Sequence, residues 1–213
     1  MDTPEDFVQL VKVSKDTFLE FLNSVQEKII IAKAGYFKYE VESLLKLARD
    51  KRIKCTLFVD SDENSVRFGF GELDALKMIK ENSKLLNVQI AKHIRISIII
   101  VDDGVLIYSP AALSWEEEPA SLNYPNGIIG GKSMANSLLR QFLHEQEVPP
   151  ILENVIPFPG CSIPSNEAPE AEKKINDTVE KLTKNPPVDP SKLREIRFYR
   201  NNYKLVNMEV RGV

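Results

Sequence analysis

One stretch decides the fold: residues 95–108, which read Arg-Ile-Ser-Ile-Ile-Ile-Val-Asp-Asp-Gly-Val-Leu-Ile-Tyr. Its first half is the strongest apolar run in the chain, and its second half is a shorter run of the same kind. The Asp103-Gly104 pair between the two runs is a typical hairpin turn. The sequence therefore predicts two antiparallel strands over these residues.

Strand and helix patterns alternate on both sides of this hairpin. Strands are predicted over 7–13, 28–32, 54–59, 88–91 and 127–129. Helices are predicted after an N-cap at Ser14 and over 40–51, 73–86 and 132–145. Strands that alternate with helices are typical of an α/β fold with a largely parallel sheet. We therefore expect a mixed, mainly parallel central sheet flanked by helices, with one antiparallel hairpin.

The composition narrows the class of protein. The chain has 213 residues, a net charge of −3 and 43% hydrophobic residues, which is globular composition without a strong overall field toward nucleic acid. The two cysteines, Cys55 and Cys161, are too few for a disulfide framework or a cysteine-based zinc site, and we expect no metal or cofactor. No apolar run is long enough to span a membrane, and no signal peptide is visible. We expect a cytoplasmic protein with no membrane partner.

The prolines divide the chain. Nine of its 13 prolines lie between Pro149 and Pro190. We expect a compact domain over 1–147, a proline-rich connector over 148–165 and an accessory segment over 166–213. Within that segment, the charged helix predicted over 167–184 is interpreted as a solvated arm or a dimerisation helix. The strand-like pattern over 195–213 continues to the last residue. Two explanations are open: the strand docks on the first domain, or the sequence is the front of a longer protein, which we favour.

The order of elements over residues 7–145 resembles one half of the phospholipase D superfamily. That family carries a His-x-Lys pair on a strand and an Asp five residues after the Lys. A Gly-Ser-x-Asn segment ends its return strand, and a later Asn-x-Glu or similar polar pair follows. The pattern of apolar residues here is similar over roughly two-thirds of the chain, whereas the residues at the family's functional positions differ.

The resemblance places the family's functional residues on this sequence as follows. The nucleophilic His falls on Arg95 and the phosphate-binding Lys on Ser97, whereas Asp102, Ser109 and Asn126 retain the family's residue types. The Asn of the return segment becomes Ala111 or Ala112, and the later acidic residue becomes Ile128.

An arginine stays protonated and cannot attack phosphorus, but it can bind a phosphate through two parallel hydrogen bonds. The resemblance thus implies a degenerate, non-catalytic prokaryotic domain that binds an anion or phosphate-containing ligand. Arg95, Ser97, Asp102, Ser109 and Asn126 are the expected ligand-binding residues. The family architecture further implies a homodimer in which the hairpin near Asp102 and Ser109 faces the two-fold axis.

Two other functions remain open. His93 lies two residues before Arg95, and a displaced His-x-Lys-like pair there would make the protein an active phosphodiesterase or nuclease. The basic C-terminal segment could instead contact nucleic acid through Arg194, Arg197, Arg200 and Lys204, with Phe198, Tyr199 and Tyr203 interleaved among them. The alternative for that segment is an edge hairpin with charged outward side chains.

Two weaker motifs are interpreted as ordinary structure. Residues 126–133 resemble a P-loop but have one residue too few between the glycines, which favours a plain strand, turn and helix. Residues 60–64 resemble part of a calcium loop but lack its glycine and distal glutamate, which favours a solvated turn.

Overall fold

The computed structural model describes residues 7–91, 94–109, 125–142 and 168–187. Its strands are β1 (Val8–Val11), β2 (Lys28–Lys33), β3 (Lys54–Asp60), β4 (Val88–Ala91), β5 (Ser97–Val101), β6 (Gly104–Tyr108) and β7 (Gly127–Gly130). Its helices are α1 (Lys15–Asn23), α2 (Lys38–Asp50), α3 (Glu63–Arg67), α4 (Leu73–Glu81), α5 (Lys132–Phe142) and α6 (Ala168–Lys184). None of these helices is both long enough and apolar enough to cross a bilayer.

The strands form one seven-stranded sheet in the order β1-β7-β6-β5-β2-β3-β4. The α/β class with flanking helices is confirmed, but the expected mainly parallel sheet is wrong. Only the β2–β3 and β3–β4 ladders are parallel, whereas β1–β7, β7–β6, β6–β5 and β5–β2 are antiparallel. The reason is that, among neighbouring strands, helices connect only β2 to β3 and β3 to β4, whereas the chain reverses between β4 and β5, without a helix among the described residues, and again at the hairpin.

The predicted hairpin lies in the middle of this sheet. β5 pairs with β6 on one side and with β2 on the other, and all five of its side chains are buried. The strand begins at Ser97, so Arg95 and Ile96 precede it. At its other end Asp102 adopts a positive φ of 49°, which suits the tight turn.

The Asp102 carboxylate ties this turn to the start of β2. It accepts backbone N–H groups from Gln26, Glu27 and Lys28 at 2.7 to 3.0 Å. The Asp102 N–H in turn donates to the Lys28 carbonyl at 3.0 Å. Residues distant in sequence are thereby locked into the register that places β5 against β2.

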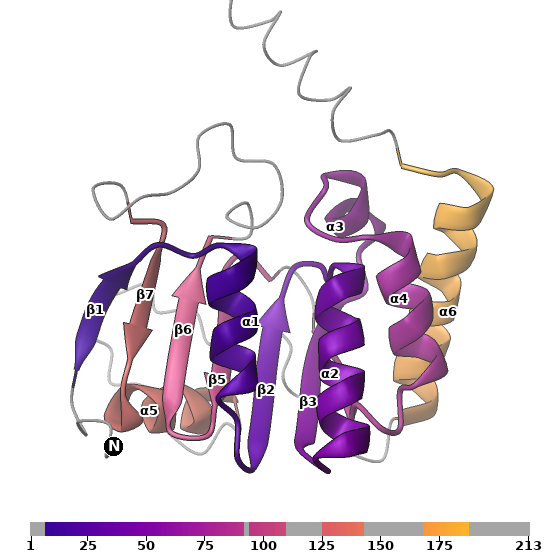
Figure 1. Ribbon diagram of the computed structural model, residues 1–213. Coiled ribbons are helices and arrows are strands. Elements are labelled where there is room, and N and C mark those ends of the chain that lie inside the picture. Colours follow the sequence, from indigo (N-terminus) through magenta and orange to yellow (C-terminus); the bar gives the residue numbers. More distant parts are fainter. Residues whose placement is uncertain (1–6, 92–93, 110–124, 143–167, 188–213) are drawn as a thin grey trace, which may run out of the picture.

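Helices cover both faces of the sheet (Figure 1). One core cluster joins α1, α2, α4 and α6 to one face, through side chains such as Ile31, Leu57 and Ile99. The second cluster lies on the opposite face, where α5 packs on Ile98, Ile100 and Val105. Alternate residues of β5 therefore contribute to different cores, as the two-residue period of a strand requires.

Most predicted elements are confirmed, with shifts of a few residues at their ends. Ser14 caps α1, where its hydroxyl accepts the Thr17 N–H at 3.3 Å. The P-loop-like stretch forms β7 and α5, and its Lys132 pairs with Asp103 of the hairpin turn at 3.3 Å. The short helix α3 was not predicted, because Asp62 in the supposed solvated turn is in fact its N-cap.

The prediction of a solvated arm or dimerisation helix is wrong for α6. This helix packs on α4 and alongside β4, and it buries Ile175 and Leu182 in the same core as α1 and α2. The Thr178 hydroxyl also donates to the Ser61 carbonyl at 2.7 Å. The connector over 148–165 and the strand-like pattern over 195–213 lie outside the described residues.

Substitution of Leu182 tests whether α6 contributes to the stability of the sheet. Because Leu182 is fully buried, Leu182→Ala should lower the free energy of unfolding by about 2–5 kcal/mol. The neighbouring Lys181 is exposed, so Lys181→Ala should change it by less than about 0.5 kcal/mol. Urea unfolding of the full chain measures both values. Equal effects of the two substitutions would show that α6 does not share the core.

Candidate functional site

Three polar side chains lie next to one another at one end of the central strands. Ser97 opens β5 and pairs directly with Tyr108 at the end of β6. Lys33 is the last residue of β2. It follows Ala32, which is the last residue of β2 to pair with β5 and lies opposite Ile98. Lys33, Ser97 and Tyr108 therefore form a row across three adjacent strands, which we call the strand-end row. All three side chains are buried.

Glu40 of α2 neutralises the charge in this row. Its Oε1 lies 2.5 Å from the Lys33 Nζ, and its Oε2 accepts the Phe37 N–H at 2.9 Å. Both side chains of the pair are at most 3% exposed. A carboxylate in the first turn of a helix is also favoured by the free N–H groups there. The ion pair is thus held by the fold and does not depend on solvent.

Aromatic rings surround the Lys33 ammonium. Its Nζ lies 5.4 to 5.8 Å from the ring centroids of Phe18, Tyr36, Phe37 and Tyr108. Burial lowers the pKa of Lys33, and the charge and hydrogen bond of Glu40 oppose that shift. The aromatic rings and Glu40 take the place of the water that would solvate an exposed lysine. The Lys33 ammonium therefore has its interaction partners within the protein.

Three hydroxyl groups beside this pair are buried and make no hydrogen bond of ordinary geometry among the described residues, although Ser97 lies close enough to Tyr108 to lower the pKa of that tyrosine slightly against the effect of burial. They belong to Tyr39, Ser97 and Tyr108. Burial raises the pKa of Tyr108 well above its usual value, so its hydroxyl stays protonated. Buried hydroxyls normally find a partner. These hydroxyls therefore retain unused hydrogen-bonding capacity in the buried interior.

Arg95 stands outside the row on a firmly held backbone. The N–H of the preceding residue, Ile94, donates to Oδ2 of Asp60 at 3.1 Å, and Oδ1 of Asp60 accepts the Asp62 N–H at 3.0 Å. Burial of Asp60 raises its pKa, while the two backbone N–H groups and, to a smaller extent, the Arg95 charge oppose that rise. The exposed Arg95 guanidinium donates to the Ile94 carbonyl at 3.3 Å. The expectation that residues 60–64 are only a solvated turn is therefore wrong for Asp60.

The structure brings some of the predicted ligand-binding residues together and separates others. Arg95 and Ser97 lie at the end of the sheet where β6 leads into the exposed Ser109. Asn126 is at this end too, but its carboxamide accepts from the Val13 N–H and donates to the Val13 carbonyl. Asp102 lies at the opposite end of the hairpin. It follows Ser97 by the length of β5, which is roughly 16 Å at a rise of about 3.3 Å per residue.

Sequence reasoning did not single out Lys33, Glu40, Tyr108 or Asp60. A lysine at the end of the apolar run 29–32 was the available signal for Lys33. Its pairing with Glu40 depends on how α2 packs on the sheet, which the local sequence does not reveal.

The described residues contain no imidazole, because both His93 and His144 lie outside them. Arg194, Arg197, Arg200 and Lys204 lie outside them as well. Burial raises the pKa of the free Cys55 thiol to about 11, so it is not a nucleophile near neutral pH. No cluster of potential metal ligands occurs in the described part of the chain.

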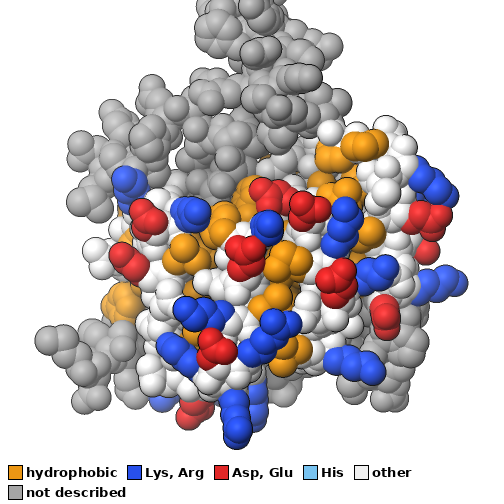
Figure 2. Space-filling model, turned by 45° about the vertical axis from the view of Figure 1, so that its right-hand side comes forward, with side chains coloured by type: hydrophobic (Ala, Val, Ile, Leu, Met, Phe, Trp, Pro, Cys, Tyr) orange, Lys and Arg blue, Asp and Glu red, His pale blue; other side chains and the backbone are white. Residues whose placement is uncertain are grey.

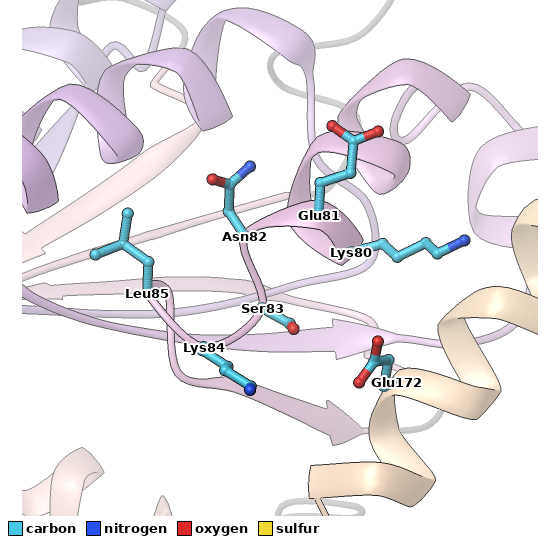
Figure 3. A pocket seen from close by; sticks show the side chains of 7 residues that line it. All are labelled: Lys80, Glu81, Asn82, Ser83, Lys84, Leu85 and Glu172. Carbon is cyan, nitrogen blue, oxygen red and sulfur yellow. The ribbon is translucent and has the colours of Figure 1, made fainter.

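A shallow pocket of about 500 Å³ lies elsewhere, between the end of α4 and α6 (Figure 3). Lys80, Lys84, Glu81 and Glu172 line it together with Asn82, Ser83 and Leu85. Positive and negative side chains are interspersed over the surface shown in Figure 2, with apolar side chains between them. Neither feature provides the concentration of positive charge that a phosphate-rich polymer requires.

Comparisons with known proteins find structural likeness only. No family model matches the chain, and no curated protein matches it significantly. Three solved structures show low similarity. TrmBL2, an archaeal chromatin protein, is 16% identical with a TM-score of 0.44, over 68% of this chain and 53% of that one. Nuc from Salmonella typhimurium, a phospholipase D family member, is 14% identical with a TM-score of 0.43, over 66% of this chain and 93% of that one.

The third is phosphatidylserine synthase from Haemophilus influenzae Rd KW20, which is 12% identical with a TM-score of 0.47, over 84% of this chain and 44% of that one. The chain thus spans about half the length of TrmBL2 and less than half of the synthase. At such low similarity we transfer no activity from these proteins to this chain.

Breaking the Lys33–Glu40 pair tests its role in the strand-end row. Lys33→Met leaves a buried carboxylate without its partner and should lower the free energy of unfolding by about 3–5 kcal/mol. Lys33→Met/Glu40→Gln should recover most of this loss, because Gln keeps an oxygen for the Phe37 N–H and removes the charge. Chemical unfolding of the wild type, both single variants and the double variant measures the coupling. Additive effects would contradict the ion pair.

Proposed function

We propose that this chain is a non-catalytic, phospholipase D-like domain that binds a small anionic group, such as a phosphate, beside the strand-end row. The observation that carries the proposal is the position of Arg95. An exposed guanidinium lies two residues before Ser97, the residue with a buried hydroxyl that begins the strand. The ligand would meet a permanent positive charge on the outside and hydroxyl donors further in.

The charge distribution favours Arg95 over Lys33 as the anion-binding group. Lys33 is buried and paired with Glu40, so an anion would have to displace a carboxylate to reach it. Arg95 has five N–H donors in a planar fork, of which one hydrogen bond goes to Ile94. The backbone beneath it is fixed by Asp60, which reduces the entropy lost when a ligand binds.

The same arrangement argues against hydrolysis. An attack on phosphorus needs a group that can lose its proton at working pH, and Arg95 cannot. The pKa of Tyr108 is raised, which keeps its hydroxyl protonated, and the Lys33 amine is held by Glu40. The remaining candidate is His93, which lies outside the described residues. Nucleic-acid contact through the basic C-terminal segment also stays a prediction.

Binding of inorganic phosphate and phenyl phosphate tests the proposal, with calorimetry as the measurement. Arg95→Met should weaken binding roughly 10- to 100-fold, because a charge-assisted hydrogen bond contributes about 1.5–3 kcal/mol. The exposed Arg49, which donates to Asn82 on the helical side, is the matched control, and Arg49→Met should leave binding unchanged. Equal loss in both variants, or no phosphate binding by the wild type, would contradict the proposal.

A chromogenic phosphodiester, bis(p-nitrophenyl) phosphate, separates binding from catalysis. We expect the purified wild type to release no nitrophenol above the rate of a buffer blank. His93→Ala should then bind phosphate as the wild type does. Turnover by the wild type that disappears in His93→Ala would instead establish the phosphodiesterase.

A further inference from the structure

Asp60 is a buried acidic residue beside the proposed anion site. It is the last residue of β3 and is 3% exposed. Its charge interacts with that of Arg95, which opposes the rise in the Asp60 pKa that burial causes. A carboxylate at this place is unfavourable for anion binding, because like charges repel. Direct attraction of the ligand therefore does not explain Asp60.

Both carboxylate oxygens of Asp60 hold backbone N–H groups. Oδ1 accepts the Asp62 N–H at 3.0 Å, and Oδ2 accepts the Ile94 N–H at 3.1 Å. The first bond is local, whereas the second joins residues that are 34 positions apart in the chain. An ionised carboxylate suits two such donors, because both of its oxygens accept and neither carries a proton. Asp60 thus links the end of β3 to the segment that leads into β5.

Arg95 is one residue away from this link. Its guanidinium donates to the Ile94 carbonyl at 3.3 Å. The Ile94 side chain is 1% exposed and belongs to the core cluster that α5 covers. The N–H, carbonyl and side chain of Ile94 are therefore all engaged within the protein, and the Arg95 side chain starts from a fixed backbone.

The turn that carries Asp60 is itself held by two helices. Asp62 is the N-cap of α3, and its side chain accepts the Asn64 N–H at 3.0 Å. In addition, the Thr178 hydroxyl of α6 donates to the Ser61 carbonyl at 2.7 Å. A side chain positions its neighbours well when its own surroundings are fixed in this way. Asp60 is therefore attached to a firm part of the fold.

We propose that Asp60 is a positioning residue of the anion site, which holds the Arg95 guanidinium ready for an anion through the Ile94 backbone. The inference rests on the proposed function, because Asp60 acts only through Arg95. A guanidinium on a loose segment loses conformational freedom when it binds, and a fixed backbone removes part of that loss in advance. This gain exceeds the repulsion between Asp60 and the anion.

One substitution separates positioning from repulsion. Asp60→Asn keeps the size of the side chain but removes its charge and leaves one acceptor oxygen for two N–H donors. If repulsion dominated, the loss of a negative charge would tighten phosphate binding. Because Asp60 positions Arg95, the lost hydrogen bond weakens phosphate binding instead. The sign of the change therefore decides between the two roles.

Calorimetry with inorganic phosphate measures this sign in the full chain. Asp60→Asn should weaken binding roughly three- to tenfold, which corresponds to the net contribution of one hydrogen bond. Asp62→Asn is the matched control, because it removes the same charge from the same turn, keeps a good N-cap and leaves the Ile94 N–H bond to Asp60 intact. It should bind phosphate at least as tightly as the wild type.

A double variant shows whether Asp60 acts through Arg95. In the Arg95→Met background, Asp60→Asn should cause no further loss of phosphate binding, whereas its effect on the free energy of unfolding should persist. Equal or tighter binding by Asp60→Asn, or the same loss in both backgrounds, would overturn this inference and leave the proposed function intact. A wild type that binds no phosphate, or an Arg95→Met variant that binds like the wild type, would instead refute both.

Amide hydrogen exchange tests the link in the wild type, without a substitution. A ligand that binds the folded site suppresses the local openings of the segment that carries it. Saturating phosphate should therefore slow exchange of the Ile94 amide several-fold. The Gln26 and Lys28 amides, which the Asp102 carboxylate holds at the opposite end of the hairpin, are the matched control and should be unaffected. An unchanged Ile94 rate, or equal slowing of all three amides, would overturn the proposal.

Discussion

The complete burial of β5 is the constraint on which the rest of the structure depends. A strand with five buried side chains must be covered on both faces and paired on both edges, since its backbone groups would otherwise lose water without gaining hydrogen bonds. Helices α1, α2, α4 and α6 cover one face of the sheet and α5 covers the other. β2 and β6 supply the two ladders. The Asp102 carboxylate then holds the far end of the hairpin against the start of β2.

Polar chemistry is consequently confined to the ends of the central strands. At one end, Lys33, Ser97 and Tyr108 come together under α1 and α2, and Glu40 compensates the only charge in that row. Removing two charges from water is costly and requires close pairing, which the 2.5 Å contact provides. The interior of the row is thus electrically neutral and its lysine is paired, with the exposed Arg95 outside it. It is less suited to moving protons, because burial raises the pKa of Tyr108 and so keeps its hydroxyl protonated, and Glu40 holds the Lys33 amine.

The sequence predicted individual elements well and their partners less well. The apolar run 98–101 and the Asp-Gly turn identify the hairpin, and Ser14 identifies the start of α1, because both signals are local. The mainly parallel sheet was wrong, because alternating strands and helices do not reveal which strand lies beside β5. Asp60 was missed for a similar reason. A carboxylate in an acidic turn looks solvated until the Ile94 N–H, distant in sequence, is found beside it.

The residue pattern by itself determined the class of fold and the hairpin, and it places a permanently charged residue, Arg95, just before the central strand. These depend on side-chain type and on spacing along a few residues. Only the tertiary structure decided that Lys33 pairs with Glu40, that α6 joins the main core and that β1 is the outermost strand next to β7 among the described strands. Each of these depends on contacts between segments far apart in the chain, and such contacts follow from packing and not from local preference.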